Sequence, residues 1–242
     1  MRLSIQLYTV RDALKADFLG TLTRLREIGL EYVELAGDLG GGTAAEAKAI
    51  LDDLGLKVSG AHVPLDRLRN DLEGAIAELK ALDCPYAIVP FVGEDDRDWE
   101  ALAATLTPIG KRLKEAGLVL AYHNHDFEFP GGGFDTLYAK TNPNLLQAEL
   151  DLAWIAIAGH DPVAILREHA HRTPLVHLKD YDPNATPRWR PAGEGVMDWA
   201  AILPVCEEIG VRFGMIELDE SPGDPLEAVA TSYGFLKAKG LG

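Results

Sequence analysis

Residues 111–128 read KRLKEAGLVLAYHNHDFE, and this stretch contains the unit from which the fold of the chain follows. An amphipathic segment ends at Gly117, a short apolar run follows over 119–123, and polar residues come directly after that run. Glycine often ends a helix because it adopts a positive φ without strain. A short apolar run bounded in this way is typical of a strand that is covered on both faces. The stretch therefore predicts a helix, a buried parallel strand and a polar loop.

The same unit recurs along the chain, with a glycine between helical segment and apolar run at Gly29, Gly55, Gly117 and Gly210. Eight apolar runs alternate with helix-period segments, which favours a closed barrel over a doubly wound sheet with its fewer strands. No linker or change of composition divides the chain, so we expect residues 1–242 to form one α/β domain, a (β/α)8 TIM barrel. The predicted strands are 2–8, 32–35, 57–62, 87–91, 119–123, 146–150, 175–178 and 213–218. The predicted helices are 17–28, 45–54, 72–82, 99–116, 162–169, 199–209 and 225–237, with a weaker one at 134–138.

The charge balance excludes one large class of partner. Acidic residues outnumber basic ones 38 to 23, and the net charge is −15. Proteins that bind nucleic acid use clustered lysine and arginine to neutralise phosphates, and no block of consecutive basic residues occurs in this chain. We therefore expect no nucleic-acid partner.

Cellular location is inferred from three features of the sequence. No apolar stretch approaches the ~20 residues that a membrane span requires, so we expect no membrane partner. The N-terminal residues lack the apolar run and cleavage site of a signal peptide. Cys84 and Cys206 are far apart and have apolar neighbours, which indicates buried free thiols rather than a disulfide framework. These features predict a cytoplasmic protein.

Polar residues interrupt the apolar pattern at the ends of four successive predicted strands. A single histidine or aspartate at a strand end is commonly a cap or a loop hydrogen bond, but four such ends in register favour a shared site. Mixed imidazole and carboxylate ligands suit Mn²⁺, Co²⁺, Zn²⁺ or Mg²⁺. We therefore predict one divalent metal ion at the C-terminal end of the barrel. The residues concerned are His123, Asn124, His125, Asp126 and Glu128; Glu149 and Asp151; His177, Lys179 and Asp180; and Glu217, Asp219 and Glu220.

Other strand ends and loops on the same rim are candidates for binding substrate. His62 ends the third predicted strand, Tyr8 ends the first, and Arg188 lies in the loop after the seventh. The glycine-rich loop 37–42 has no phosphate-binding frame around it, so we interpret it as a mobile lid. The loop after the last strand reads LDESPGDP and is acidic, which argues against a phosphate site there.

At this point the sequence resembles the xylose isomerase-like barrel superfamily, in the branch labelled sugar phosphate isomerase/epimerase. The matching stretches are SIQLYTVRD, YHNHDFEF, LDLAWIAIAGHDP, VHLKD, GEGVMDW and IELDE, and they span nearly the whole chain in family order. The resemblance implies a divalent metal held by Glu, Asp, His and Glu from strands five to eight. Asp151, His177 and Glu217 match that pattern. The fifth strand departs from it, because His123 stands where relatives have glutamate. Glu128 is our candidate for the fourth ligand, with His123 or His125 as the alternatives.

The resemblance implies a metal-dependent isomerase or epimerase of a small polyhydroxy carbonyl compound, such as a keto-sugar or keto-inositol, acting by proton transfer through an enediolate. In such epimerases the two ligand glutamates are base and acid, which would be Glu217 and Glu128. If His123 or His125 replaces the carboxylate in function, an imidazole acts as acid or base instead. Lys179 either stabilises developing negative charge or forms a surface ion pair with Asp180.

Rival functions share the fold or the site. A lyase or dehydratase, inosose dehydratase-like or cleaving keto-glycosides, would begin with the same proton transfer. A non-catalytic carbohydrate-binding barrel fits poorly with so many ionisable groups on one rim, and a DNA-repair nuclease of related fold would require a basic groove. The sequence leaves the oligomeric state open, a homo-oligomer included.

Overall fold

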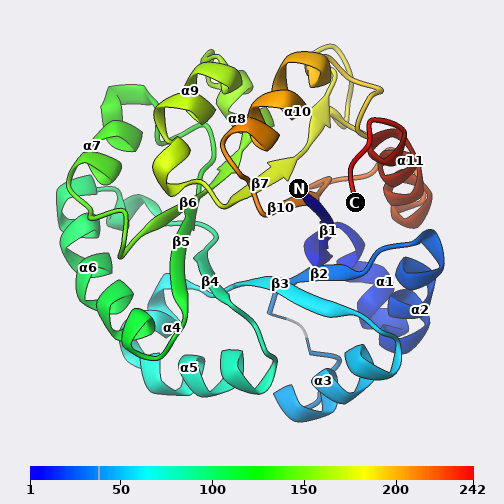
Figure 1. Cartoon of the computed structure of the whole chain (residues 1–242), viewed down its shortest axis with the longest axis horizontal. Helices are drawn as coiled ribbons and strands as arrows, with labels where there is room; N and C mark the ends of the chain where they lie inside the picture. Colours follow the sequence, from blue (N-terminus) through cyan, green and yellow to red (C-terminus); the bar gives the residue numbers. More distant parts are fainter. Residues whose placement is uncertain (38) are drawn as a thin grey trace.

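Each of the eight apolar runs forms a strand in the computed structural model, which describes residues 1–37 and 39–242. All neighbouring strands are parallel and close in the order β1-β10-β7-β6-β5-β4-β3-β2, with helices around them (Figure 1). This confirms the predicted (β/α)8 barrel. The strands are β1 (Arg2–Gln6), β2 (Tyr32–Leu35), β3 (Lys57–His62), β4 (Tyr86–Val89), β5 (Val119–His123), β6 (Gln147–Asp151), β7 (Leu175–Leu178) and β10 (Phe213–Ile216).

The helices also follow the predicted segments, and Gly29, Gly55, Gly117 and Gly210 all have positive φ at their ends. Three short helices, α1, α4 and α8, were not predicted, because each has only six residues and shows too little periodicity. The helices are α1 (Arg11–Ala16), α2 (Phe18–Ile28), α3 (Ala44–Asp53), α4 (Leu65–Asn70), α5 (Leu72–Ala81), α6 (Trp99–Glu115), α7 (Gly133–Ala139), α8 (Leu152–Ile157), α9 (Pro162–Glu168), α10 (Trp199–Glu208) and α11 (Pro225–Ala238).

The first strand is shorter than predicted. It ends at Gln6, because Leu7–Val10 turn into a short 3-10 helix. The Gln6 side-chain oxygen accepts a hydrogen bond from the Tyr8 backbone N–H at 3.0 Å and stabilises that turn. Tyr8 therefore leaves the barrel wall, and its side chain is 44% exposed at the mouth.

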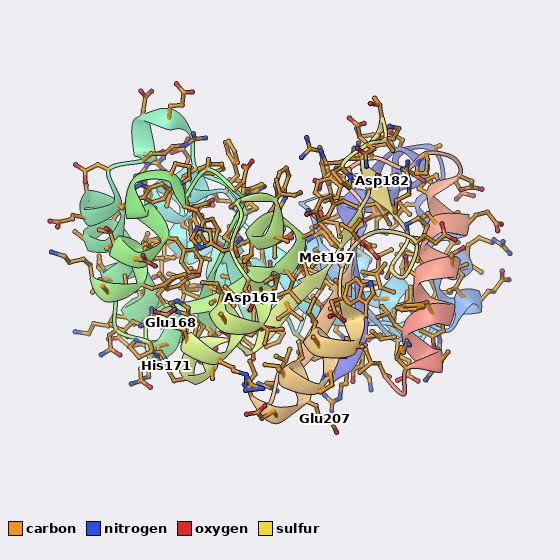
Figure 2. The ribbon with its side chains drawn as sticks, turned by 90° about the horizontal axis from the view of Figure 1, so that it is seen from above. Asp161, Glu168, His171, Asp182, Met197 and Glu207 are labelled. Atoms are coloured by element: carbon orange, nitrogen blue, oxygen red, sulfur yellow. The ribbon has the colours of Figure 1, made fainter. Side chains whose placement is uncertain are left out.

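The barrel interior is apolar at one end and polar at the other, because alternate strand residues point inward. An apolar layer fills the barrel at the N-terminal ends of the strands, opposite the polar end. In Figure 2 the C-terminal end is the upper one, where Asp182 lies, and His171 and Glu207 lie at the lower end. The apolar layer consists of Tyr86, Ile88, Ala121, Leu175, Phe213 and Met215.

Two further expectations concern the surface. Within residues 1–37 and 39–242, no helix is both long enough and apolar enough to cross a membrane. The predicted lid, 37–42, includes Asp38, which lies outside the described residues, so the lid stays a prediction.

Both thiols are expected to be unreactive in the folded protein. Cys84 and Cys206 are free and buried, as predicted, and burial raises the pKa of each thiol to about 12. Because the thiolate is the reactive form, we expect no alkylation by iodoacetamide in mildly alkaline native buffer and labelling of both residues in urea. Peptide mass spectrometry measures this. Labelling of either cysteine before unfolding would contradict the burial.

Candidate functional site

A pocket of about 300 Å³ opens at the C-terminal end of the barrel. It collects side chains from strand ends that are far apart in the sequence, as the closed parallel barrel requires. Aromatic residues stand at its mouth, with Phe91 51% exposed and Tyr8 44% exposed, while ionisable residues form its floor. The lining residues are Tyr8, His62, Pro90, Phe91, His123, His125, Lys179, Glu217 and Asp219.

Four buried side chains at this end form the group that we call the rim cluster: His123, Asp151, His177 and Glu217. One ligand atom from each lies within 4.8 Å of the other three. His123 ends β5, Asp151 ends β6, His177 lies in β7, and Glu217 directly follows β10. The His177 Nδ1 is 2.5 Å from Glu217 Oε2, and the His123 Nε2 is 3.8 Å from Asp151 Oδ2. The structure thus brings together the three residues that the resemblance had matched, with His123 as the fourth.

Asp151 is oriented by the helix that follows it. Its Oδ1 accepts hydrogen bonds from the backbone N–H groups of Ala153 and Trp154, each at 3.0 Å, and so caps α8. This leaves Oδ2, which is buried and accepts no hydrogen bond, toward the other cluster residues. One oxygen therefore fixes the carboxylate, and the other faces a cation, the Lys179 ammonium at 3.0 Å.

Glu128, the predicted fourth ligand, is not brought to the rim cluster. One of its oxygens accepts a hydrogen bond from the Tyr122 hydroxyl at 2.9 Å, and the other accepts one from the His125 N–H at 2.9 Å. Tyr122 and His123 are adjacent in β5 and point to opposite faces of the sheet. Glu128 follows the Tyr122 face, outside the barrel, whereas His123 points inward. Burial raises the pKa of Glu128 to about 7.

Lys179 is 1% exposed and lies among carboxylates. Its Nζ is 3.0 Å from Asp151 Oδ2, 2.9 Å from Glu217 Oε2 and 2.8 Å from Asp219 Oδ1. Burial alone would lower the pKa of Lys179, but these carboxylates outweigh it and raise the pKa well above its ordinary value. Lys179 is therefore a cation of the pocket, and the alternative of a surface ion pair with Asp180 is wrong.

Asp180 instead organises the loop after β7. Its carboxylate accepts hydrogen bonds from the backbone N–H groups of Tyr181, Gly193 and Met197 and from the Trp199 indole N–H, all at 2.8–3.0 Å. These bonds hold the hairpin of β8 (Asp180–Tyr181) and β9 (Trp189–Arg190) over the barrel. Gly195 is required there, because a Cβ at this position would come within 2.2 Å of Asp180 Oδ1. Trp189 of the hairpin packs beside Lys179, with Nζ 5.1 Å from the ring centroid.

Of the remaining residues predicted to act on or bind substrate, three line the pocket and one lies outside it. His125 lines the pocket, stacks on Phe127 with ring centroids 5.4 Å apart, and has its pKa lowered by burial to about 3. His62 and Tyr8 also line the pocket. Arg188 is exposed on the β8–β9 hairpin and is not among the lining residues, because the hairpin turns its Trp189 neighbour inward instead.

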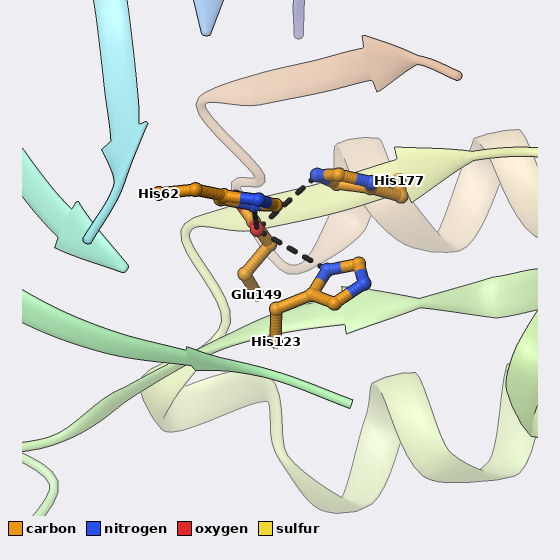
Figure 3. A group of neighbouring side chains, drawn as sticks. All are labelled: His62, His123, Glu149 and His177. Atoms are coloured by element: carbon orange, nitrogen blue, oxygen red, sulfur yellow. Dashed lines mark hydrogen bonds and ion pairs between the residues drawn. The ribbon is translucent and has the colours of Figure 1, made fainter. Parts of the chain in front are cut away.

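Of two buried carboxyl groups below the rim cluster, Glu149 was expected only as one of the polar residues at strand ends, and Glu34 was not expected at the site. Glu34 of β2 and Glu149 of β6 are both 0% exposed, and Figure 3 shows Glu149 surrounded by His62, His123 and His177. Period-two alternation gives a signal for both: Glu149 stands two residues before Asp151 and shares its face, and Glu34 is the lone charge in the apolar strand YVEL.

The chemistry of the pocket fits a bound cation. Glu34, Glu149, Asp151, Glu217 and Asp219 face only Lys179 and His177 as positively charged groups among the described lining and cluster residues. One buried oxygen each of Glu34 and Glu149 has no hydrogen-bond partner, and Asp151 Oδ2 shares the Lys179 ammonium with Glu217 and Asp219. Unpaired buried carboxylate oxygens are costly unless a cation or donor binds them, so a divalent metal at the rim cluster would relieve this excess of negative charge.

The electrostatics of individual groups follow from burial and neighbours. Burial would lower the pKa of His177, but Glu149, Glu217 and Glu34 outweigh it and raise the pKa well above its ordinary value. Burial would raise the pKa of Glu217, but Lys179 and His177 outweigh it and lower the pKa. Burial, assisted by the neighbouring charge of Glu217, raises the pKa of Asp219 to about 6.

Curated relatives and solved structures resemble this chain to different extents. An inosose dehydratase of Clostridium botulinum (strain Alaska E43 / Type E3) is 26% identical over 170 residues, which cover 60% of this chain and 56% of that protein. The chain therefore spans about half the length of such relatives.

Among solved structures, a sugar phosphate isomerase/epimerase of Parabacteroides distasonis superposes with a TM-score of 0.86 at 23% identity, covering 98% of this chain and 93% of that one. The IOLI protein with a bound zinc atom superposes with a TM-score of 0.76 at 16% identity, covering 98% and 97%. These structural likenesses concern the fold.

A family model for the xylose isomerase-like TIM barrel matches residues 22–239, nearly the whole chain. The match includes the strands that carry His62, His123, Asp151, His177 and Glu217. With the closed eight-stranded barrel and this sequence match together, the chain belongs to the xylose isomerase-like TIM barrel family.

Proposed function

We propose that this protein is a divalent-metal-dependent enzyme that removes a proton beside the carbonyl group of a small polyhydroxy ketone and so isomerises or epimerises it. The observation that carries the proposal is the rim cluster, in which two imidazoles and two carboxylates converge within 4.8 Å, with His123 and Glu217 lining an open pocket. That mixed nitrogen and oxygen donor set suits Zn²⁺, Mn²⁺ or Co²⁺, and it also admits Mg²⁺. The IOLI protein, a structure of the same fold, has a bound zinc atom, which supports a metal-dependent function for this chain.

His123, Asp151, His177 and Glu217 would hold the metal. When bound, a divalent ion supplies Lewis-acid polarisation of the substrate carbonyl and orients a neighbouring hydroxyl. The Lys179 ammonium lies 2.9 Å from Glu217 and 3.0 Å from Asp151, where it would stabilise negative charge that develops on the substrate oxygen. Trp154 and Trp189 flank the Lys179 side chain and keep water from it.

Proton transfer is assigned to side chains on different sides of the pocket. His125 follows β5 and Asp219 follows β10, and these strands are separated in the barrel by β6 and β7. The imidazole of His125 is neutral, because burial lowers its pKa to about 3, and its Nδ1 has no hydrogen-bond partner, so it is available to a substrate only as a weak base. Asp219, with its pKa raised to about 6 by burial, can donate or accept one. A base and an acid on different sides suit epimerisation, which moves a proton from one face of a carbon to the other.

Dehydration is the second candidate, and the curated relatives favour it. Proteins named inosose dehydratase match 60% of the chain. Elimination starts with the same proton removal, after which an acid protonates a leaving hydroxyl on the next carbon. Cleavage of a keto-glycoside would differ only in the leaving group. The rim cluster and Lys179 would serve each reaction in the same way, so the product distinguishes them.

Proton exchange in D₂O is the experiment that tests the proposal. We expect the Mg²⁺- or Zn²⁺-loaded protein to replace the hydrogen on the carbon beside the carbonyl of a ketose or keto-inositol with deuterium. NMR measures this exchange. Deuterium with inverted configuration or a moved carbonyl supports the isomerase or epimerase, and an enone or released aglycone supports the lyase. The Asp151→Asn variant is the control for metal-independent exchange. Absence of exchange across ketoses and keto-inositols would contradict both functions.

A further inference from the structure

Glu34 and Glu149 lie one layer below the rim cluster and contact its two histidines from beneath. The His177 Nε2 is 2.9 Å from Glu34 Oε1 and 3.1 Å from Glu149 Oε2. The His123 Nδ1 is 3.3 Å from the same Glu149 oxygen, a charge contact without hydrogen-bond geometry, and that oxygen also lies 3.0 Å from His62 Nε2. Figure 3 shows this single oxygen of Glu149 as the point on which the three imidazoles converge.

Each rim histidine thus has one ring nitrogen at the rim and the other at a buried carboxylate. His177 directs Nδ1 toward Glu217, and His123 directs Nε2 toward Asp151. An imidazole has to lose its positive charge to bind a metal and then carries one N–H, and a carboxylate at one nitrogen holds the hydrogen there. The opposite nitrogen then presents its lone pair, which is the form that binds a metal. The buried carboxylates would therefore select the tautomers that the rim cluster needs.

The backbone is shaped to admit Glu34. The register of β2 against β3 shifts between Val33 and Glu34, and such irregularities re-aim side chains beside functional sites. Opposite it stands Gly60, where a Cβ would meet Glu34 Oε2 at 3.0 Å and Ile88 Cδ1 at 2.6 Å. The Gln6 amide donates a hydrogen bond to Glu34 Oε1 at 2.7 Å. Burying this carboxylate is costly, and the strand, the glycine and the amide all accommodate it.

We propose that Glu34 and Glu149 are positioning residues, which orient His177 and His123 and fix their tautomers for metal binding at the rim cluster. The inference rests on the proposed metal site and assigns to Glu34 and Glu149 the role of supporting its two histidine ligands. A rival assignment places a second ion among His62, His123, Glu149 and His177, whose ligand atoms also lie within 4.8 Å of one another. If both sites held an ion, His123 and His177 would each have to bridge two ions. We therefore favour Glu34 and Glu149 as supporting carboxylates over a second metal site.

Calorimetric titration with Zn²⁺ alone tests the proposal on the full chain. We expect wild type to bind one equivalent, and Glu149→Gln and Glu34→Gln to bind one equivalent about 10- to 100-fold more weakly, as is usual when an outer carboxylate is lost. Ser59→Ala is the matched control. It removes another buried polar group from the barrel interior, whose hydroxyl contacts Ser4 and the Val33 carbonyl rather than a histidine, and its affinity should equal that of wild type.

NMR of the imidazole groups in the zinc-loaded protein reports the tautomers of His123 and His177 directly. We expect slowly exchanging Nε2–H of His177 and Nδ1–H of His123 in wild type, and faster exchange or altered tautomers in the glutamine variants. Circular dichroism checks that the variants fold. Unchanged affinity and unchanged tautomers in both variants would overturn the proposal, and so would two zinc equivalents in wild type that fall to one in Glu149→Gln. Failure of wild type to bind zinc would instead refute the metal site itself.

Discussion

Replacing Asp151 with alanine is expected to abolish metal binding and proton exchange, with a loss in metal affinity greater than about 100-fold, above the range for outer carboxylates. Asp151 supplies a buried rim oxygen that accepts no hydrogen bond and lies beside Lys179 and His123. His177→Ala should give the same result, because His177 joins the rim cluster to Glu34 and Glu149. Metal content after dialysis and calorimetric titration measure the effect. Undiminished metal binding in both variants would end the model.

Controls separate metal binding from helix capping, since Asp151 also caps α8. Asp151→Asn keeps an oxygen for the cap but removes the charge, so it should fold like wild type and still bind metal poorly. Asp161→Ala removes the matched cap of α9, a bond from Val163 N–H at 2.9 Å. It should cost about 1 kcal/mol of stability and leave metal binding intact.

The same titration decides between His123 and Glu128, two of the three candidates for the fourth ligand. His123 belongs to the rim cluster, while both oxygens of Glu128 already accept hydrogen bonds outside it. His123→Ala should therefore weaken metal binding more than Glu128→Gln. The reverse order would restore Glu128 as the ligand.

Replacing Asp180 with alanine is expected to lower the free energy of unfolding by roughly 3–5 kcal/mol. The substitution leaves the N–H groups of Gly193 and Met197 and the Trp199 indole without their buried acceptor, and each such loss costs about 1–3 kcal/mol, partly recovered by water. The hairpin that carries Trp189 should also become more mobile, which would expose the Lys179 side chain to water. Urea unfolding measures the stability, and proton exchange measures the effect on the pocket.

Asp182→Asn provides the comparison for Asp180. Asp182 lies in the same hairpin, at the upper end in Figure 2, and its side chain accepts one exposed turn hydrogen bond from Asn184 N–H. We expect a change within about 0.5 kcal/mol, as for most surface substitutions. If Asp180→Ala destabilised the protein no more than Asp182→Asn, the four hydrogen bonds to Asp180 would contribute nothing measurable to stability.

Sequence alone was sufficient for the barrel, because its signals are local. Helix-ending glycines such as Gly117, and short apolar runs such as 119–123, report backbone conformation and burial without knowledge of distant residues. The same order along the chain placed Asp151, His177 and Glu217 at one end, since parallel strands all end on the same side. The boundary of β1 was wrong by two residues, because the side chain of Gln6 caps a turn that the apolar pattern conceals.

Only the tertiary structure decided which polar residues meet. Glu128 and His123 are close in sequence, yet alternation along β5 directs His123 inward and Tyr122 outward, where the Tyr122 hydroxyl donates a hydrogen bond to Glu128. Glu34 and His177 are 143 residues apart, and their contact depends on the barrel closing and on the register shift beside Gly60. Periodicity predicts which face of the sheet a residue points to within one strand. The register between strands, which decides which side chains share a layer, is set by packing across the whole barrel.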